Sequence, residues 1–151
     1  MSRYGKRDDL IVHEAEPFNA ETGLSSLGKP VTDTDAFYVR GHGAIPETDP
    51  ESWRLQVVGL VERELNLSFG TLREAFRERT VTATLQCAGN RRAGLMAVRD
   101  IPDEAPWGPG ATGTATWTGV ALADVLALAR PLEPASDVGF EGADLSPETE
   151  P

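Results

Sequence analysis

The single cysteine, Cys87, is the feature that most constrains how this chain can fold. One thiol cannot form a disulfide within the chain, and it excludes a zinc site built only from cysteines. The fold must therefore be held together by a buried apolar core. With 151 residues, 40% of them hydrophobic, the chain has the size of one domain or of part of a larger one. A domain of this size buries about 70% of its unfolded surface, which is enough without crosslinks.

The charge balance narrows the classes of partner. The chain has 14 Lys and Arg against 24 Asp and Glu, a formal net charge of −10. Nucleic acids and anionic membranes are bound by clustered basic residues, so this balance argues against both. No segment approaches the roughly 20 apolar residues of a membrane span, and the first ten residues lack the apolar core of a secretory signal. We therefore expect a cytoplasmic protein with no nucleic-acid partner and no membrane partner.

The first third of the sequence has few regular patterns. Residues 1–30 mix charges, glycine and serine without a sustained period, which predicts an extended N-terminal arm. Residues 31–151 are expected to form the folded domain. Within it, apolar and aromatic residues over 36–40 predict a strand, and glycine and proline over 41–46 predict a loop after it.

The middle of the chain has a clearer pattern. Apolar residues alternate with polar ones over 53–57, and a second short run follows over 65–67, which together predict a β-hairpin. Ser68 is a good N-cap for a helix, because the apolar residues over 69–76 fall at helical spacing.

Another strand and another helix are predicted in the second half. Apolar residues alternate with threonine over 81–87, which predicts a strand that ends at the cysteine, and a loop is expected over 88–92. Residues 107–119 are rich in glycine and threonine. Thr118 is the predicted cap of a helix over 120–129.

The end of the sequence is acidic. From Pro131 onward there are six acids and no base, and residues 138–140 resemble the start of one more strand. The whole pattern predicts an α+β fold with a mixed sheet that the sequence cuts short.

The segment around the cysteine has the strongest chemical signal. The predicted strand end fixes the direction of Cys87, the small Ala88 and Gly89 let a bulky group approach, and Arg91 and Arg92 follow. Guanidinium groups near a thiol favour its thiolate form, which binds soft metals, and they also hold oxyanions by paired hydrogen bonds. From these residues alone, the simpler interpretation of Cys87 is a small buried hydrophobe, because a lone cysteine more often has that role.

Three ordered blocks of sequence carry a resemblance to a known family. They are residues 37–46 (FYVRGHGAIP), 85–92 (LQCAGNRR) and 107–120 (WGPGATGTATWTGV), with a similar strand pair beginning in 53–61. Together they resemble the sulfite oxidase-type molybdenum oxidoreductases over residues 30–145.

The resemblance implies a cofactor and a reaction. It implies a sulfite-oxidase-like molybdopterin-binding domain in which one molybdopterin holds molybdenum through its dithiolene, with Cys87 as the protein ligand. A thiolate suits such a soft, high-valent centre. The protein would be an oxidoreductase that moves an oxygen atom to or from a small oxyanion such as sulfite, with nitrate and sulfoxides as other substrates of the family.

The first block implies most of the cofactor contacts. Carried over residue by residue, it places Tyr38, Val39, Arg40, Gly41 and His42 along the cofactor. Arg40 would face the open side of the metal. Without the resemblance, Arg40 is a surface arginine at a strand end and His42 is a turn residue. The family has asparagine where Gly41 stands, so one polar contact with the cofactor is expected to be missing.

The later blocks imply the remaining site residues. Arg92 would join Arg40 in binding the oxyanion, and Arg91 would support the loop or the pterin phosphate. Trp107 would form a wall of the substrate pocket. Asp144 matches an acid that reaches the pterin, although a solvated acidic tail is the simpler reading of its surroundings.

Partners follow from what the sequence contains. No haem or flavin motif is visible, so electrons are expected to pass to a separate acceptor, a cytochrome or oxygen. Family members continue through a further part of the cofactor domain and often add a dimerisation domain. We therefore expect a fragment or a truncated product, with a homodimer only in a full-length form. Two other functions stay open, a non-catalytic remnant of this fold and a thiol-redox protein that uses Cys87.

Overall fold

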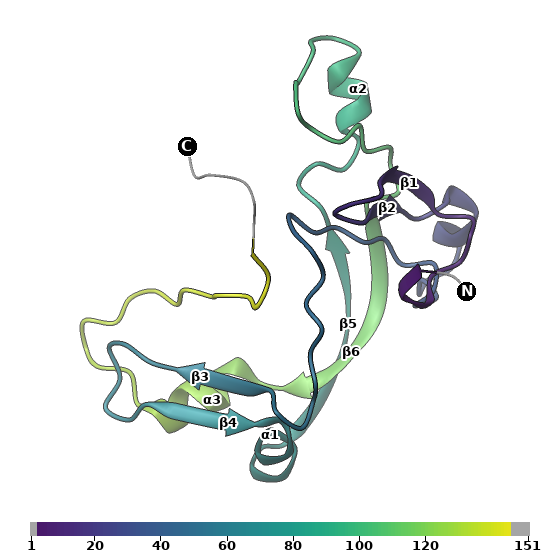
Figure 1. The fold of residues 1–151 in the computed structure, drawn as a ribbon. Helices are drawn as coiled ribbons and strands as arrows, with labels where there is room; N and C mark the ends of the chain where they lie inside the picture. Colours follow the sequence, from purple (N-terminus) through teal and green to yellow (C-terminus); the bar gives the residue numbers. More distant parts are fainter. Residues whose placement is uncertain (1–2, 146–151) are drawn as a thin grey trace. The chain divides into compact units, whose positions relative to one another are not determined.

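The computed structural model describes residues 3–145, which divide into two compact units (Figure 1). The first unit comprises the described parts of Met1–Ile45, Thr82–Thr116 and Asp144–Pro151. The second comprises Pro46–Val81 and Trp117–Ala143. Each unit is thus assembled from segments that lie far apart in the sequence.

The first unit begins with a small strand pair between two short 3-10 helices. Its elements are η1 (Arg3–Gly5), β1 (Ile11–Glu14), β2 (Asn19–Glu21) and η2 (Leu24–Gly28), and the two strands pair antiparallel. Every residue of β2 is buried, and Leu10, Phe18 and Ala20 form an apolar cluster. The segment expected to be an extended arm is therefore folded in, because its few apolar residues meet across a tight turn. The domain boundary expected after residue 30 stays a prediction, and it does not coincide with a boundary between compact units.

The strand expected over 36–40 is reduced to a single bridge. Val39 and Ala20 exchange backbone hydrogen bonds of 2.8 and 3.0 Å. Ala36 donates to the carbonyl of Asp33 at 2.9 Å, so the chain is still turning just before the bridge. This prediction was wrong in extent because a local turn competes with the strand pattern.

The two longest strands of the protein pair with each other. They are β5 (Glu78–Gln86) and β6 (Thr112–Val120). The hydroxyl groups of Thr84 and Thr114 lie 2.7 Å apart, and those of Thr80 and Thr118 lie 3.1 Å apart, so the two strands run antiparallel. The strand predicted over 81–87 is thus confirmed, with three more residues at its start and its end at Gln86, one residue before the cysteine. A short helix, α2 (Arg92–Met96), follows the loop after β5.

The hairpin and helix predicted for the second unit are confirmed. They are β3 (Arg54–Val57), β4 (Leu65–Ser68) and α1 (Phe69–Ala75). The Ser68 hydroxyl accepts a hydrogen bond from the backbone N–H of Thr71 at 3.0 Å, which caps the first turn of α1.

The second unit closes with α3 (Leu122–Ala129), which lies beside the β3–β4 pair (Figure 1). The apolar core of the second unit contains Leu65, Leu67, Leu72, Val125 and Ala129. The cap of α3 is Ala121, not Thr118 as predicted, because residues up to 120 belong to β6. The strand expected over 138–140 does not form, and this segment has no regular structure.

The α+β class predicted from the sequence is confirmed, whereas a continuous mixed sheet is not seen. The described strands form three two-stranded sheets. Within residues 3–145, no helix has the length and apolar character needed to cross a membrane.

Candidate functional site

The loop after β5 holds Cys87 in a fixed position. The backbone N–H of Cys87 donates to the carbonyl of Ala111 at 2.9 Å, and the side-chain oxygen of Asn90 accepts from the N–H of Ala111 at 3.1 Å. The thiol sulfur accepts a hydrogen bond from the N–H of Gly89 at 3.4 Å, and Cys87 is half-buried and free. The loop is therefore tied to the start of β6, with a partly accessible thiol at its base.

Tyr38 shares the surroundings of this thiol. Burial raises the pKa of the Tyr38 phenol above its ordinary value, and the negative charge of a Cys87 thiolate raises that pKa further. The neighbouring ring of Phe37 stacks on Tyr38 at 5.3 Å between centroids. A methyl group at Gly113 would lie 2.6 Å from the Phe37 ring, so glycine in β6 lets this aromatic pair pack closely. The structure thus brings the first and second sequence blocks together.

The side chain of Asn19 holds the loop of residues 40–42 through two hydrogen bonds to the backbone of Gly41, which we call the Asn19 clamp. Its side-chain oxygen accepts from the N–H of Gly41 at 2.9 Å, and its amide nitrogen donates to the Gly41 carbonyl at 3.1 Å and to the carboxylate of Glu14. Asn19 is fully buried. Sequence reasoning missed it, because one asparagine in an irregular segment is not distinctive until the strand pair places it.

The side chains of Arg40 and His42, on either side of Gly41, contact each other. A terminal guanidinium nitrogen of Arg40 lies 3.1 and 3.2 Å from the two ring nitrogens of His42, and the other contacts the Gly41 carbonyl. Both side chains line a cavity of about 130 Å³. The cavity is also lined by three acids, Glu14, Asp103 and Glu104. The cavity therefore holds more acidic than basic side chains.

The two arginines after the cysteine have different surroundings. One terminal nitrogen of Arg92 lies 2.5 Å from the carboxylate of Glu104 and donates to the Ala105 carbonyl at 3.1 Å. Arg91 is exposed, with a left-handed φ of 68°, and its backbone N–H donates to the Gly108 carbonyl at 2.8 Å. The guanidinium of Arg92 is thus already engaged by an acid, and Arg91 anchors the loop through its backbone.

Trp107 is fully buried and is not among the residues that line the cavity beside Arg40 and His42. Its ring packs edge-on against His13 at 4.9 Å. His13 lies 3.3 Å from the carboxylate of Glu21, and both side chains are at least nine-tenths buried. A methyl group at Gly108 would collide with that carboxylate. The role of Trp107 as a pocket wall stays a prediction, and the buried pair beside it was missed because its members lie in the irregular first segment.

Val39 and Asp144, the two other residues predicted to contact the cofactor, differ in their surroundings. Val39 lies next to Arg40 and is held by its bridge to Ala20. Asp144 is exposed in the irregular segment after α3. Among residues 3–145, no described hydrogen bond or ion pair joins Asp144 to the Cys87 loop. The assignment of Asp144 to the pterin stays a prediction.

The donor set around Cys87 fits one kind of metal site. Within the described part of the chain, no three His, Cys, Asp or Glu side chains gather in a group that could hold a metal ion. Cys87 is therefore a single soft donor. A metal bound here must bring its other ligands with it, as a metal carried on an organic sulfur cofactor does.

Comparison with known proteins identifies the fold and the relatives. Residues 42–151 match the family described as oxidoreductase molybdopterin binding domain. Sulfite oxidase from Gallus gallus is 42% identical over 142 residues, covering 91% of this chain and 31% of that protein. The NADPH nitrate reductase of Aspergillus niger is 40% identical over 136 residues, covering 87% of this chain and 16% of that protein.

A solved structure agrees with this. The crystal structure of the sulfane dehydrogenase SoxCD from Paracoccus pantotrophus matches with a TM-score of 0.67 at 23% identity, over 85% of this chain and 32% of that one. The chain thus spans less than a third of each of these relatives. Because the family match covers most of its length, and because relatives at about 40% identity match along most of this chain, the chain belongs to the oxidoreductase molybdopterin-binding domain family.

Proposed function

We propose that this chain binds molybdopterin through Cys87 and takes part in oxygen-atom transfer to or from a small oxyanion such as sulfite. The observation that carries the proposal is the Cys87 loop. A single half-buried thiol follows a strand end and is tied by backbone hydrogen bonds through both its N–H and its carbonyl. Among residues 3–145, no group of three His, Cys, Asp or Glu side chains could hold a metal ion. Family membership supports the same reading.

Each residue of the site has a part in this proposal. Cys87 would hold the metal, and Tyr38, next to it in an environment that keeps its phenol protonated, would donate a hydrogen bond toward the cofactor. When bound, the cofactor supplies the redox centre for oxygen-atom transfer. Val39 and Gly41 would bring the backbone of the first block alongside the cofactor, and the hydrogen bonds from Asn19 to Gly41 hold that backbone in place.

Arg40 is the residue that would orient the substrate. A guanidinium presents paired N–H donors that match two oxygens of an oxyanion, and in a partly closed cavity such charge-assisted bonds are strong. His42, within 3.2 Å of the Arg40 guanidinium, restricts its position. Arg92 would add a second positive charge to the oxyanion site once the carboxylate of Glu104 releases its guanidinium.

The proposal extends to partners that the sequence predicts. A separate electron acceptor, a cytochrome or oxygen, would remove the electrons, and a homodimer belongs to a longer form of the protein. The location proposed is cytoplasmic.

The test is turnover of molybdenum-loaded protein from cells that make the cofactor, with sulfite as substrate and an artificial electron acceptor. Replacement Arg40→Gln should raise the KM for sulfite by about tenfold or more, since a charged hydrogen bond to the substrate is lost. Arg77→Gln removes the same charge from an exposed site in the second unit and should change nothing. Protein that takes up no molybdenum, or an Arg40→Gln variant with an unchanged KM, would refute the proposal. Rapid alkylation of Cys87 in metal-free protein would favour the thiol-redox alternative.

A further inference from the structure

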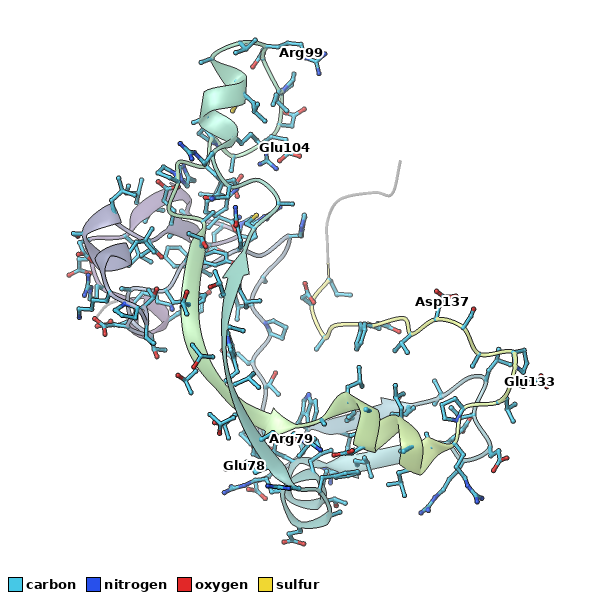
Figure 2. All side chains as sticks on the ribbon, turned by 180° about the vertical axis from the view of Figure 1, so that it is seen from behind. Glu78, Arg79, Arg99, Glu104, Glu133 and Asp137 are labelled. Carbon is cyan, nitrogen blue, oxygen red and sulfur yellow. The ribbon has the colours of Figure 1, made fainter. Side chains whose placement is uncertain are left out.

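Glu104 belongs to two parts of the site at once. Its carboxylate pairs with Arg92 at 2.5 Å, and the same residue lines the cavity that contains Arg40 and His42. Figure 2 shows Glu104 on the segment that follows α2, at the base of the turn that also carries Arg99. Arg92 itself is not among the residues that line this cavity, so Glu104 is the side chain that contacts Arg92 and also faces the cavity.

The two partners of this ion pair are not equally free to move. The side chain of Arg92 is 18% exposed, whereas that of Glu104 is 43% exposed. The guanidinium packs against Gly89 so closely that a methyl group there would lie 2.7 Å from a terminal nitrogen. Arg92 also donates to the Ala105 carbonyl. The arginine is therefore held in place, and the acid is the member that can turn out to solvent.

A carboxylate and an oxyanion compete for the same donors. Both present two oxygens to one guanidinium edge, so an N–H that is bound by Glu104 is not available to a second anion. The remaining negative charge of the carboxylate would also repel that anion at short range. Glu14 and Asp103 line the same cavity and add to this repulsion.

We propose that Glu104 is an internal competitor that sets the anion affinity of the cavity. It occupies Arg92 in the unliganded protein, and an oxyanion gains Arg92 as a partner only by displacing this carboxylate. The identity of the physiological anion rests on the proposed function, but the competition itself is a property of the chain.

The test uses inorganic sulfate as the probe and isothermal titration calorimetry, with ionic strength held constant by chloride. Glu104→Gln should tighten sulfate binding by about tenfold, because Arg92 gains an N–H free for a charged hydrogen bond. Arg92→Gln should weaken binding, and in the Arg92→Gln background Glu104→Gln should lose most of its effect.

Two control variants distinguish the release of Arg92 by Glu104 from a general effect of removing a negative charge. Asp103→Asn removes one negative charge from the same cavity without touching the Arg92 pair, and asparagine tolerates the left-handed φ of 63° at this position. It should give a clearly smaller gain than Glu104→Gln. Glu133→Gln removes an exposed acid of the second unit and should give none (Figure 2). Equal gains from Asp103→Asn and Glu104→Gln would overturn the proposal.

A structural role for the pair has a different outcome. If Glu104 only clamps the loop, Glu104→Gln would lower thermal stability and leave sulfate binding unchanged or weaker, which would refute the competition. Side-chain NMR of Arg92 gives an independent readout in the unmodified protein. Sulfate should shift the guanidinium signals as the carboxylate leaves, and unchanged signals at saturating sulfate would contradict the inference.

These results are independent of the metal. A protein that binds no molybdenum and still shows tighter sulfate binding in Glu104→Gln would refute the proposed function and keep the competition. A molybdenum-loaded protein in which Glu104→Gln does not change sulfate binding would refute the competition and leave the proposed function standing.

Discussion

Tyr38 is the residue that reports most directly on the site. Its phenol is kept protonated by burial and by the nearby charge of a Cys87 thiolate. Arg40, two residues later, is held beside His42 over the Asn19 clamp. One short segment therefore presents to the site a neutral hydrogen-bond donor and a fixed cation.

The coupling between Tyr38 and Cys87 can be measured in metal-free protein. In a Tyr4→Phe background, Tyr38 is the only tyrosine of the two in the chain, and ultraviolet titration follows it alone. Replacing Cys87 by serine removes the thiolate charge, so the pKa of Tyr38 should fall toward its ordinary value while burial still keeps it raised. An unchanged pKa would show that the two groups do not interact.

The same interaction affects stability at high pH. Because the folded-state pKa of Tyr38 is raised, the folded state keeps its proton longer than the unfolded chain does. Stability from this group is fully present below the ordinary pKa of a tyrosine and is lost as the pH rises through the raised value. The loss should be smaller in Cys87→Ser.

Residues that act locally could be predicted from the sequence, and residues that act across the fold could not. Cys87, Tyr38 and Arg40 are in motifs that are recognisable as strings, and the structure places them in one compact unit. Asn19 and Glu104 have no such motif. Their importance comes from contacts with residues 12 to 22 positions away in the chain, which only the folded structure reveals.

At the scale of elements, the hairpin of β3 and β4 and the capped helix α1 followed from local patterns. β6 was not predicted, because its glycines interrupt the alternating pattern of a strand, although β-branched threonine favours strands. Its pairing with β5 is a long-range contact, with Thr84 facing Thr114. Because β6 was missed, the cap of α3 was predicted at Thr118, although the structure has it at Ala121.

The capping of α1 gives a test at this scale. Ser68→Ala removes the hydroxyl that accepts from the Thr71 N–H, and it should lower the free energy of unfolding by about 1 kcal/mol. Ser68→Asp supplies another cap acceptor and should retain most of the stability. Denaturant unfolding measures both variants, and equal stability of Ser68→Ala and the unmodified protein would show that the cap contributes nothing.

At the scale of the whole molecule, each compact unit is built from separate stretches of chain. The segment with Asn19 and Arg40 and the segment with Cys87 and Arg92 belong to the same unit, with residues 46–81 of the other unit between them in the sequence. The site therefore depends on long-range assembly. The chain also spans less than a third of the sulfite oxidase and nitrate reductase relatives described above, so the activity of a complete protein is part of the proposal.

The central claim is that Cys87 binds molybdenum, and X-ray absorption at the molybdenum edge tests it most directly. Protein from cofactor-producing cells is compared with Cys87→Ser, and with Arg77→Gln as the control. We expect one more sulfur neighbour of molybdenum in the unmodified protein and in the control than in Cys87→Ser. An equal number of sulfur neighbours in all three would contradict it.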